Sequence, residues 1–149
     1  MIKGVKIFPK KQILDERGKI VHMLSKKDNH FKKFGEIYFS HTYPNAIKAW
    51  HKHKKMTLNY AVISGKIKLV LFDDRKNSKT KGLIQEVFLS TENYYLIQIP
   101  PLIWNGFKSI GNTTAIVANC SDIPHDEKEI VRKKYDDKYF NYSWNIKHS

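Results

Sequence analysis

Short runs of β-branched and aromatic residues recur along the whole chain, and clusters of turn-forming residues separate them. The clearest alternation lies in the run 66–73, where Ile67, Leu69 and Leu71 share one face of a strand. Runs of this kind predict β-strands. We expect ten of them, at Lys3–Phe8, Lys19–Leu24, Glu36–Thr42, Lys48–His53, Leu58–Ile63, Lys66–Asp73, Ile84–Leu89, Tyr95–Ile99, Trp104–Ser109 and Thr114–Cys120. Many short strands at this spacing predict an all-β fold, either a jelly roll or a closed barrel.

Only one segment has the pattern of a helix, at His125–Tyr135 near the C-terminus. Pro124 suits the first turn, and the acidic residues of the segment precede its basic ones, which complements a helix dipole. A chain of 149 residues can bury a core as one domain, and no shift in composition marks a boundary. We therefore expect a single domain over 1–149 with a short C-terminal helix.

The chain is strongly basic, with 27 Lys and Arg against 14 Asp and Glu, a formal charge of +13. Such a charge favours an anionic partner, although a lysine-rich composition alone gives the same count. The lysines are scattered and form no basic helix or nucleic-acid signature, so we do not expect a nucleic-acid partner. No window approaches the roughly 18 apolar residues of a membrane span, and the N-terminus does not resemble a signal peptide. With one cysteine, Cys120, in an apolar run, we expect a reduced thiol and a cytoplasmic protein.

Two histidines, His51 and His53, lie two residues apart and share one face of a predicted strand. Their spacing is similar to the H-x-H motif of cupins, small barrels that often hold a divalent metal with two histidines, a glutamate and a later histidine. Thr57 and Leu58 stand where the glutamate is expected, and Asn105 stands in the place of the last histidine. Two nitrogen ligands do not complete a metal site, so we expect no metal and no other cofactor.

Proton transfer is the second chemistry that the pair suggests. A histidine of near-neutral pKa can remove a proton next to a ketone, and Lys48 with His53 could stabilise the enolate that forms. Arg17, in a tight turn, and Arg75, at a strand end, could hold a pyrophosphate, while Trp104 could stack on a base. The alternatives are that one histidine only completes a hydrogen-bond network and that each arginine is a solvated surface charge.

Six motifs, in order along nearly the whole chain, resemble the dTDP-4-dehydrorhamnose 3,5-epimerase family, metal-free jelly-roll cupins that act on nucleotide sugars. They are DERG at Asp15–Gly18, KAWH at Lys48–His51, the strand Gly65–Arg75, the loop Arg75–Gly82, LSTEN at Leu89–Asn93 and IPPLIWNGF at Ile99–Phe107. The resemblance implies a nucleotide-sugar substrate.

The resemblance also implies roles for individual residues. His51 would be the general base next to the 4-keto group, and Lys48 would contact the substrate or the enolate in place of a family arginine. Arg17 would contact the nucleotide diphosphate across a homodimer interface formed by an exchanged N-terminal strand. Tyr38 would lie on the inward face of its strand. Further candidates for substrate contacts are Arg75, Trp104, Asn105 and Asn119.

The chain departs from this family where the catalytic tyrosine is expected. That tyrosine lies on a late strand, and the corresponding run 118–123, ANCSDI, has none. A second family on the same fold, the dTDP-4-keto-6-deoxyglucose 3,4-ketoisomerases, has an H-x-H-K-K segment similar to residues 51–55 and an I-P-P-x-I-W stretch similar to residues 99–104. In that family both histidines move protons. The sequence therefore leaves two chemistries open.

We expect an epimerase or isomerase of a nucleotide-linked, dTDP-type 4-keto sugar in surface polysaccharide biosynthesis. In this hypothesis His51 removes the proton, and His53 or Tyr38 returns one. The absent family tyrosine favours an alternative, a non-catalytic nucleotide-sugar-binding cupin. A basic nucleic-acid-binding protein is a third possibility.

Overall fold

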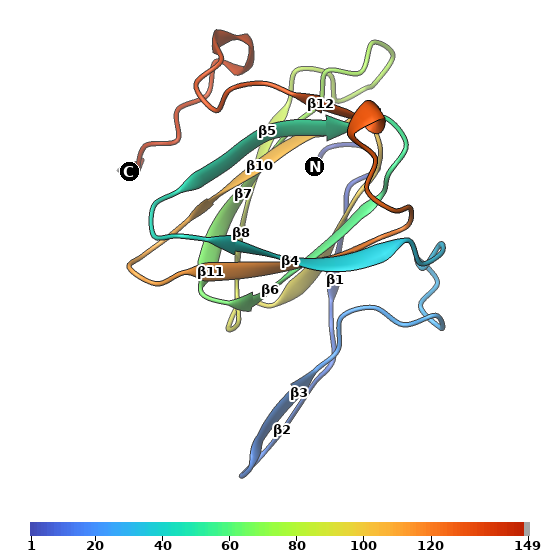
Figure 1. The fold of residues 1–149 in the computed structure, drawn as a ribbon, viewed down its shortest axis with the longest axis vertical. Helices are drawn as coiled ribbons and strands as arrows, with labels where there is room; N and C mark the ends of the chain where they lie inside the picture. The colour runs from blue at the N-terminus through green and yellow to red at the C-terminus, as the bar shows by residue number, and fades with distance from the viewer. Residues whose placement is uncertain (148–149) are drawn as a thin grey trace.

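The computed structural model describes residues 1–147 and consists mainly of two five-stranded antiparallel sheets that face each other (Figure 1). In spatial order, the first sheet contains β1 (Lys6–Pro9), β9 (Tyr95–Ile99), β6 (Leu58–Ser64), β11 (Ala115–Ser121) and β4 (Glu36–Thr42). The second contains β12 (Ile130–Arg132), β5 (Ile47–His53), β10 (Trp104–Ser109), β7 (Lys66–Phe72) and β8 (Ile84–Ser90). The all-β prediction is confirmed, and all ten expected strands lie within three residues of their predicted bounds at each end.

The core lies between the two sheets. Ile67, Leu69 and Leu71 of β7 are fully buried there, as their alternation predicts. The outer face of the second sheet is also covered, because the chain after β12 crosses it and packs Phe140 and Trp144 against Trp50 of β5. Strand β7 is therefore buried on both faces, and its outward-facing residue Val70 is apolar and buried like the residues that face the core.

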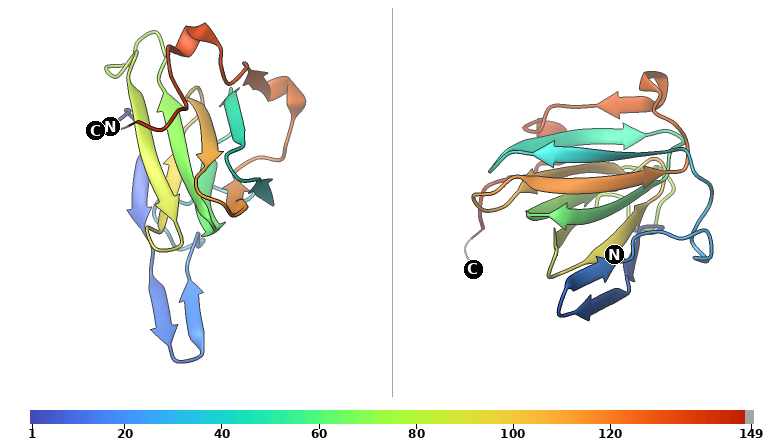
Figure 2. Two further views of the ribbon diagram at one scale, coloured as in Figure 1. Left: turned by 90° about the vertical axis from the view of Figure 1, so that its left-hand side faces the viewer. Right: turned by 60° about the horizontal axis from the view of Figure 1, so that its bottom comes forward.

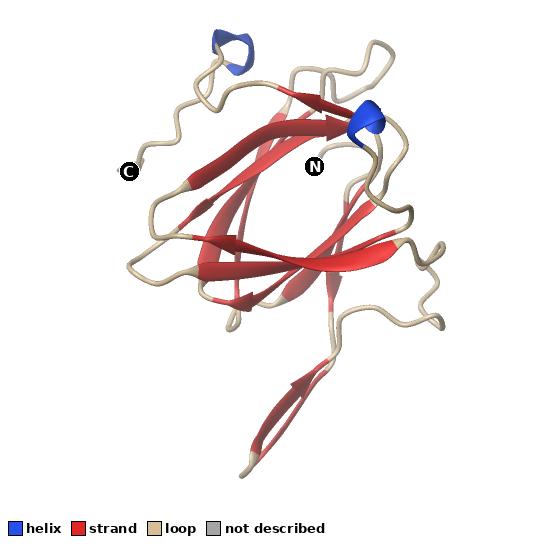
Figure 3. Ribbon diagram, viewed as in Figure 1, coloured by secondary structure: helices blue, strands red, loops and turns tan. Residues whose placement is uncertain are grey.

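The predicted C-terminal helix at His125–Tyr135 is wrong. The structure has a single 3-10 turn, η1 (Glu127–Glu129), capped by the Asp126 side chain, and then strand β12; a second 3-10 turn, η2, spans Lys138–Phe140 (Figure 3). The free edge of β5 provides the physical reason. Ile130 and Val131 are β-branched and pair with His53 and Lys52 there, which satisfies backbone groups of β5 that a helix would leave open. Within residues 1–147, no helix is long and apolar enough to span a membrane.

A hairpin of β2 (Gln12–Asp15) and β3 (Gly18–Val21) projects away from the two sheets (Figure 2). Strand β2 is absent from the sequence prediction, and β3 ends three residues before its predicted bound at Leu24. The hairpin leaves Ile13, Leu14 and Ile20 exposed. Without a buried face of its own, it lacks the clean alternation of apolar and polar residues from which strands are predicted.

Strand β10 approaches β5 closely at Gly106. The register between the two strands shifts between Asn105 and Phe107, so Gly106 lies in a bulge. A Cβ atom at Gly106 would lie 2.3 Å from the Cβ of Ala49 and 2.8 Å from its Cα. Only glycine leaves room for this approach, which places Asn105 opposite His51.

We expect the substitution Gly106→Ala to lower the free energy of unfolding by about 2 kcal/mol, because the new methyl group forces β10 away from β5. Urea denaturation followed by tryptophan fluorescence measures the change. The substitution Asn112→Ala, at an exposed turn after β10, is the control and should change the value by less than about 0.5 kcal/mol. Equal stability of the Gly106→Ala variant and the wild type would contradict the close approach.

Candidate functional site

Two adjoining cavities open between the sheets and share Tyr38 and His51. The first has a volume of about 180 Å³, and the second about 170 Å³. The first is also lined by Ser40, Lys48, Tyr60, Phe107, Val117 and Asn119, and the second by His53, Met56, His125, Ile130 and Arg132. Side chains from both sheets thus meet in one site, with β5 supplying both histidines and Lys48.

Two tyrosines flank Asn119 on the first sheet. Asn119 of β11 pairs with Tyr38 of β4 on one side and with Tyr60 of β6 on the other. The Asn119 Nδ2 group donates a hydrogen bond to the Tyr38 hydroxyl at 3.0 Å, and its Oδ1 atom accepts one from the Asn59 amide at 3.0 Å. The run 118–123 lacks a tyrosine, but the neighbouring strands bring two phenol groups to the same place in the sheet.

Tyr60 is a site residue that sequence reasoning missed. It is buried, and its hydroxyl lies 3.3 Å from Nε2 of His51 and 3.4 Å from Oδ1 of Asn105. Its signal in the sequence was the alternation Leu58, Tyr60, Val62, which places it on the inward face of β6. That alternation is also typical of a core residue, so the pattern alone gave no reason to assign it a polar role.

The hydrogen bonds around Asn105 determine which nitrogen of His51 carries the proton. The Asn105 Nδ2 group donates to the backbone carbonyls of His51, at 3.2 Å, and Ile103, at 3.4 Å. Oδ1 of Asn105 is therefore an acceptor, and the single hydroxyl hydrogen of Tyr60 points to it. The Tyr60 oxygen then accepts from Nε2–H of His51. The lone pair of the imidazole consequently lies on Nδ1.

The environment keeps the imidazole of His51 neutral. Burial, the nearby His53 and the charge of Arg132 lower the pKa of His51 to about 3. At neutral pH His51 is therefore unprotonated on Nδ1, which is the state that a general base requires.

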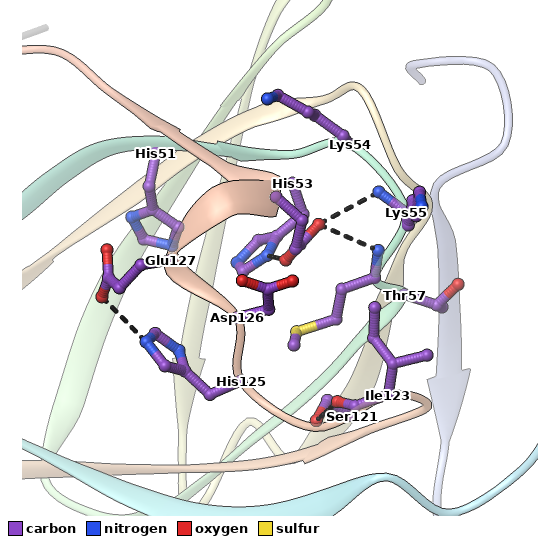
Figure 4. A network of polar contacts seen from close by, with 12 residues as sticks. His51, His53, Lys54, Lys55, Thr57, Ser121, Ile123, His125, Asp126 and Glu127 are labelled. Atoms are coloured by element: carbon purple, nitrogen blue, oxygen red, sulfur yellow. Dashed lines mark hydrogen bonds and ion pairs between the residues drawn. The ribbon is translucent and has the colours of Figure 1, made fainter.

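His53 is held by a buried carboxylate. Its Nδ1 atom is hydrogen-bonded to Glu129, and the same carboxylate accepts hydrogen bonds from the backbone amides of Lys55 and Met56 (Figure 4). Burial acts to raise the pKa of Glu129, but these hydrogen bonds outweigh it, and the net pKa is lowered. With Nδ1 bound to Glu129, Nε2 is the nitrogen of His53 that is available to a ligand. Sequence reasoning missed Glu129 because it placed this residue in a solvated helix.

Lys48 and Arg132 are the cations that line the two cavities. Lys48 donates a hydrogen bond to the Ser40 hydroxyl at 2.9 Å, and burial lowers its pKa. At the edge of the second cavity, Arg132 and His125 both contact the exposed carboxylate of Glu127, at 2.5 Å and 2.8 Å. Lys48 therefore supplies positive charge in the first cavity, whereas the charge of Arg132 at the second cavity is paired with Glu127.

Three other predicted site residues line neither of these two cavities. Arg17 is at the tip of the projecting hairpin, where it pairs with Asp15. Arg75 is bound by the buried Asp73 carboxylate at 2.9 Å. Trp104 lies on the outer face of the second sheet, where its indole donates to Asp74 at 2.7 Å. By contrast, Tyr38, Lys48, His51, His53 and Asn119 line the cavities, and Asn105 bonds to Tyr60 beside them.

Residues 1–149 match the family model described as dTDP-4-dehydrorhamnose 3,5-epimerase. The chain belongs to this family. It is 31% identical over 147 residues to the spore coat polysaccharide biosynthesis protein SpsL of Bacillus subtilis, with 97% of each chain covered. It is also 31% identical over 135 residues to the probable low-salt glycan biosynthesis epimerase Agl13 of Haloferax volcanii, with 88% of this chain and 86% of that protein covered.

The solved structure of a dTDP sugar isomerase from Desulfovibrio desulfuricans G20 is 42% identical to this chain. The TM-score is 0.93, and the alignment covers 96% of this chain and 92% of that one. These comparisons confirm the predicted cupin-type fold. They also confirm the predicted class of activity, a sugar epimerase or isomerase in polysaccharide biosynthesis.

The proton position on His51 can be tested by NMR. In ¹⁵N-labelled protein at neutral pH, we expect a two-bond ¹H–¹⁵N spectrum to show Nε2 of His51 protonated and Nδ1 unprotonated. The substitution Tyr60→Phe should give a mixture of both tautomers, because it removes the acceptor for Nε2–H. Exposed His22 is an internal control and should show averaged tautomers in both proteins. A proton on Nδ1 in the wild type would contradict the assignment.

The lowered pKa of His51 predicts a loss of stability in acid. Between its ordinary pKa of 6.5 and the folded-state value of about 3, the unfolded chain binds a proton at His51 that the folded chain does not. Stability should therefore fall as the pH falls through this window, by at most about 1.4 kcal/mol per pH unit from this one group.

Urea denaturation at several pH values from 6.5 to 4.5 measures this decline. The substitution His51→Asn removes the group, so the variant should show a shallower decline than the wild type. Carboxyl groups titrate in both proteins and cancel in the difference. Parallel curves for the two proteins would mean that His51 is readily protonated in the folded state.

Proposed function

We propose that this protein is a metal-independent epimerase of a dTDP-linked 4-keto sugar, with His51 as the general base and Tyr38 as the acid. One observation carries the proposal: a neutral imidazole, a phenol and an ammonium group line one cavity, from Lys48 and His51 on β5 and Tyr38 on the opposite sheet. In support of metal independence, Asn105 stands where a third histidine ligand would be, and the Glu129 carboxylate is committed to His53 and two backbone amides.

In the first step, Nδ1 of His51 takes the proton from the carbon next to the ketone. The electron pair of the broken C–H bond moves to the ketone oxygen, which becomes an enolate. The Lys48 ammonium supplies positive charge at this stage, when negative charge develops on the substrate. This stabilisation favours the transition state over the bound ketone.

In the second step, Tyr38 returns a proton to the same carbon. Its hydroxyl accepts a hydrogen bond from Asn119, so its own hydrogen is free to donate. The Asn119 amide then stabilises the phenolate that remains. Because Tyr38 and His51 project from opposite sheets, the proton arrives on the other face of the sugar, and the configuration at that carbon is inverted.

The His53–Glu129 pair favours a second candidate, ketoisomerisation. His53 lies on the same strand as His51, and the two ring centroids are 5.9 Å apart. A proton returned by His53 would arrive from the same side as the one removed. In this reaction one histidine takes the proton from the hydroxyl-bearing carbon next to the ketone, which gives an enediol, and the other histidine gives a proton to the former carbonyl carbon. The hydroxyl proton of the first carbon passes to the oxygen of the second, so that the first carbon becomes the new ketone.

The nucleotide diphosphate is proposed to meet Arg132 and His125 at the edge of the second cavity. Arg17 could contact the diphosphate only from a second copy, because in its own chain it lies in the turn at the hairpin tip, between β2 and β3. The three exposed apolar residues of the hairpin support the predicted homodimer, in which they would be covered. The cytoplasmic location stays a prediction.

Proton exchange in deuterated water tests the chemistry. With dTDP-4-keto-6-deoxyglucose, the wild type should exchange a sugar proton, visible by ¹H NMR, and the substitution His51→Asn should slow exchange at least about 100-fold. Equally slow exchange in both proteins would contradict the proposed catalytic role of His51.

Two further variants separate the candidate reactions. In an epimerase, Tyr38→Phe should lose inverted product while proton exchange continues, and His53→Asn should retain inversion. In a ketoisomerase, His53→Asn should abolish formation of the 3-keto product, and Tyr38→Phe should leave it largely intact. Thermal denaturation of each variant checks that the fold is preserved.

A further inference from the structure

A third cavity, of about 300 Å³, lies outside the barrel on the outer face of the second sheet. Strands β7, β8 and β10 form its floor, and the chain after η2 forms one wall with Trp144 and Lys147. Its charged lining consists of Lys68, Lys108, Lys147 and Glu86. No residue of the candidate active site contributes to it, so this cavity is a separate feature of the molecule.

Lys68 is the unusual residue of this cavity. Its side chain is buried, with only 7% of the residue exposed. Its ammonium group faces the rings of Tyr142 and Trp144, at 5.4 Å and 5.8 Å from their centroids, but has no hydrogen-bond acceptor among residues 1–147. Lys68 Nζ is not among the fully buried polar atoms that lack a partner, so the ammonium group keeps contact with the cavity and can donate hydrogen bonds to a ligand there. Burial of the side chain lowers the pKa of Lys68.

A second cation, Lys108, lies beside Lys68 on the neighbouring strand. Lys108 of β10 pairs directly with Lys68 of β7, so two positive side chains occupy neighbouring positions on one face of the sheet. Like charges in this arrangement repel each other. Lys108 is bound to the backbone carbonyl of Trp144 at 3.1 Å, which satisfies one of its hydrogens but does not neutralise its charge.

The only carboxylate that lines this cavity within residues 1–147 is already engaged. Glu86 accepts a hydrogen bond from Tyr142 at 2.5 Å and pairs with Lys147 at 2.7 Å. Three ammonium groups therefore face one carboxylate, and the described lining has an excess of two positive charges. Within residues 1–147, neither Lys68 nor Lys108, on adjacent strands, forms an ion pair with a carboxylate.

We propose that this cavity binds a sugar phosphate, with the phosphate between Lys68 and Lys108. A phosphate monoester carries nearly two negative charges at neutral pH, which matches the excess, and its oxygens would accept the free hydrogens of both ammonium groups. The cavity is larger than a phosphate group requires. Exposed Phe88 and Ile146 supply an apolar surface for the carbon face of the sugar. This site does not rest on the chemistry proposed for the barrel.

Isothermal titration of the intact protein with glucose 1-phosphate tests the site. The substitution Lys68→Met removes the charge with little change in volume and should weaken binding at least about tenfold. Lys26→Met, on an exposed loop, makes the same change in net charge and should leave affinity unchanged. Added salt should weaken binding, and glucuronate, with a single charge, should bind less tightly than glucose 1-phosphate.

NMR locates the binding and separates it from the active site. Amide signals of Ser109 and Gly111, which line this cavity, should shift on titration in the wild type but not in Lys68→Met. Saturation with dTDP should not prevent these shifts. Without ligand, Lys68→Met should unfold at the same or a higher temperature than the wild type, because the repulsion between Lys68 and Lys108 is removed.

Four results would overturn the proposal. These are equal affinity of Lys68→Met and the wild type, shifts confined to barrel residues, glucuronate binding as tightly as glucose 1-phosphate, or a marked loss of stability in unliganded Lys68→Met. The last would mean that the fold itself pairs this ammonium group. Since the assay measures binding at the outer face, its outcome is independent of whether His51 acts as a base.

Discussion

Strand β5 is paired along both edges, and the arrangement of the site follows from that constraint. On one edge, β10 comes close enough at Gly106 for Asn105 to bond to the backbone of His51 and to Tyr60. On the other edge, β12 follows the short turn that carries Glu129 to His53. Each histidine therefore has its own positioning group, Asn105 from strand β10 for His51 and Glu129 from the turn η1 for His53. The neutral state of His51 and the hydrogen bond of His53 to Glu129 are therefore set before any substrate is present.

The sequence alone predicts most of the framework, because the period of two in a strand is visible wherever one face is buried. Ile67, Leu69 and Leu71 reveal β7 in this way, and the same rule places His51 and His53 on one side. The rule fails for β2, which has no buried face, and for β12, where a cluster of charged residues is equally typical of a solvated helix. The pairing of Ile130 and Val131 with β5 is a tertiary contact that local sequence does not encode.

The site is predictable where a residue's role depends on its own strand, and it is hidden where the role depends on a neighbour. The family tyrosine is expected on one strand, in the run 118–123, whereas the sheet brings Tyr38 and Tyr60 from the two neighbouring strands to either side of Asn119. Trp104 is the opposite case, a residue that the sequence assigned to the site but that the sheet places outside it. Its bulk suggested a stacking surface for a base, but one step of alternation from Asn105 places it on the outer face, with its indole bonded to Asp74.

The link between Glu129 and His53 also bears on the order in which the protein matures. The two residues are separated by 76 positions in the chain, and Glu129 lies on a segment that follows β11. During synthesis from the N-terminus, the strands from β1 to β11 leave the ribosome before this segment does. A barrel can therefore close around an incomplete pair of histidines, and His53 acquires its carboxylate only when the final portion of the chain has been made. Nascent chains that stop short of this point would lack the Glu129 carboxylate and also the His125, Ile130 and Arg132 side chains that line the second cavity.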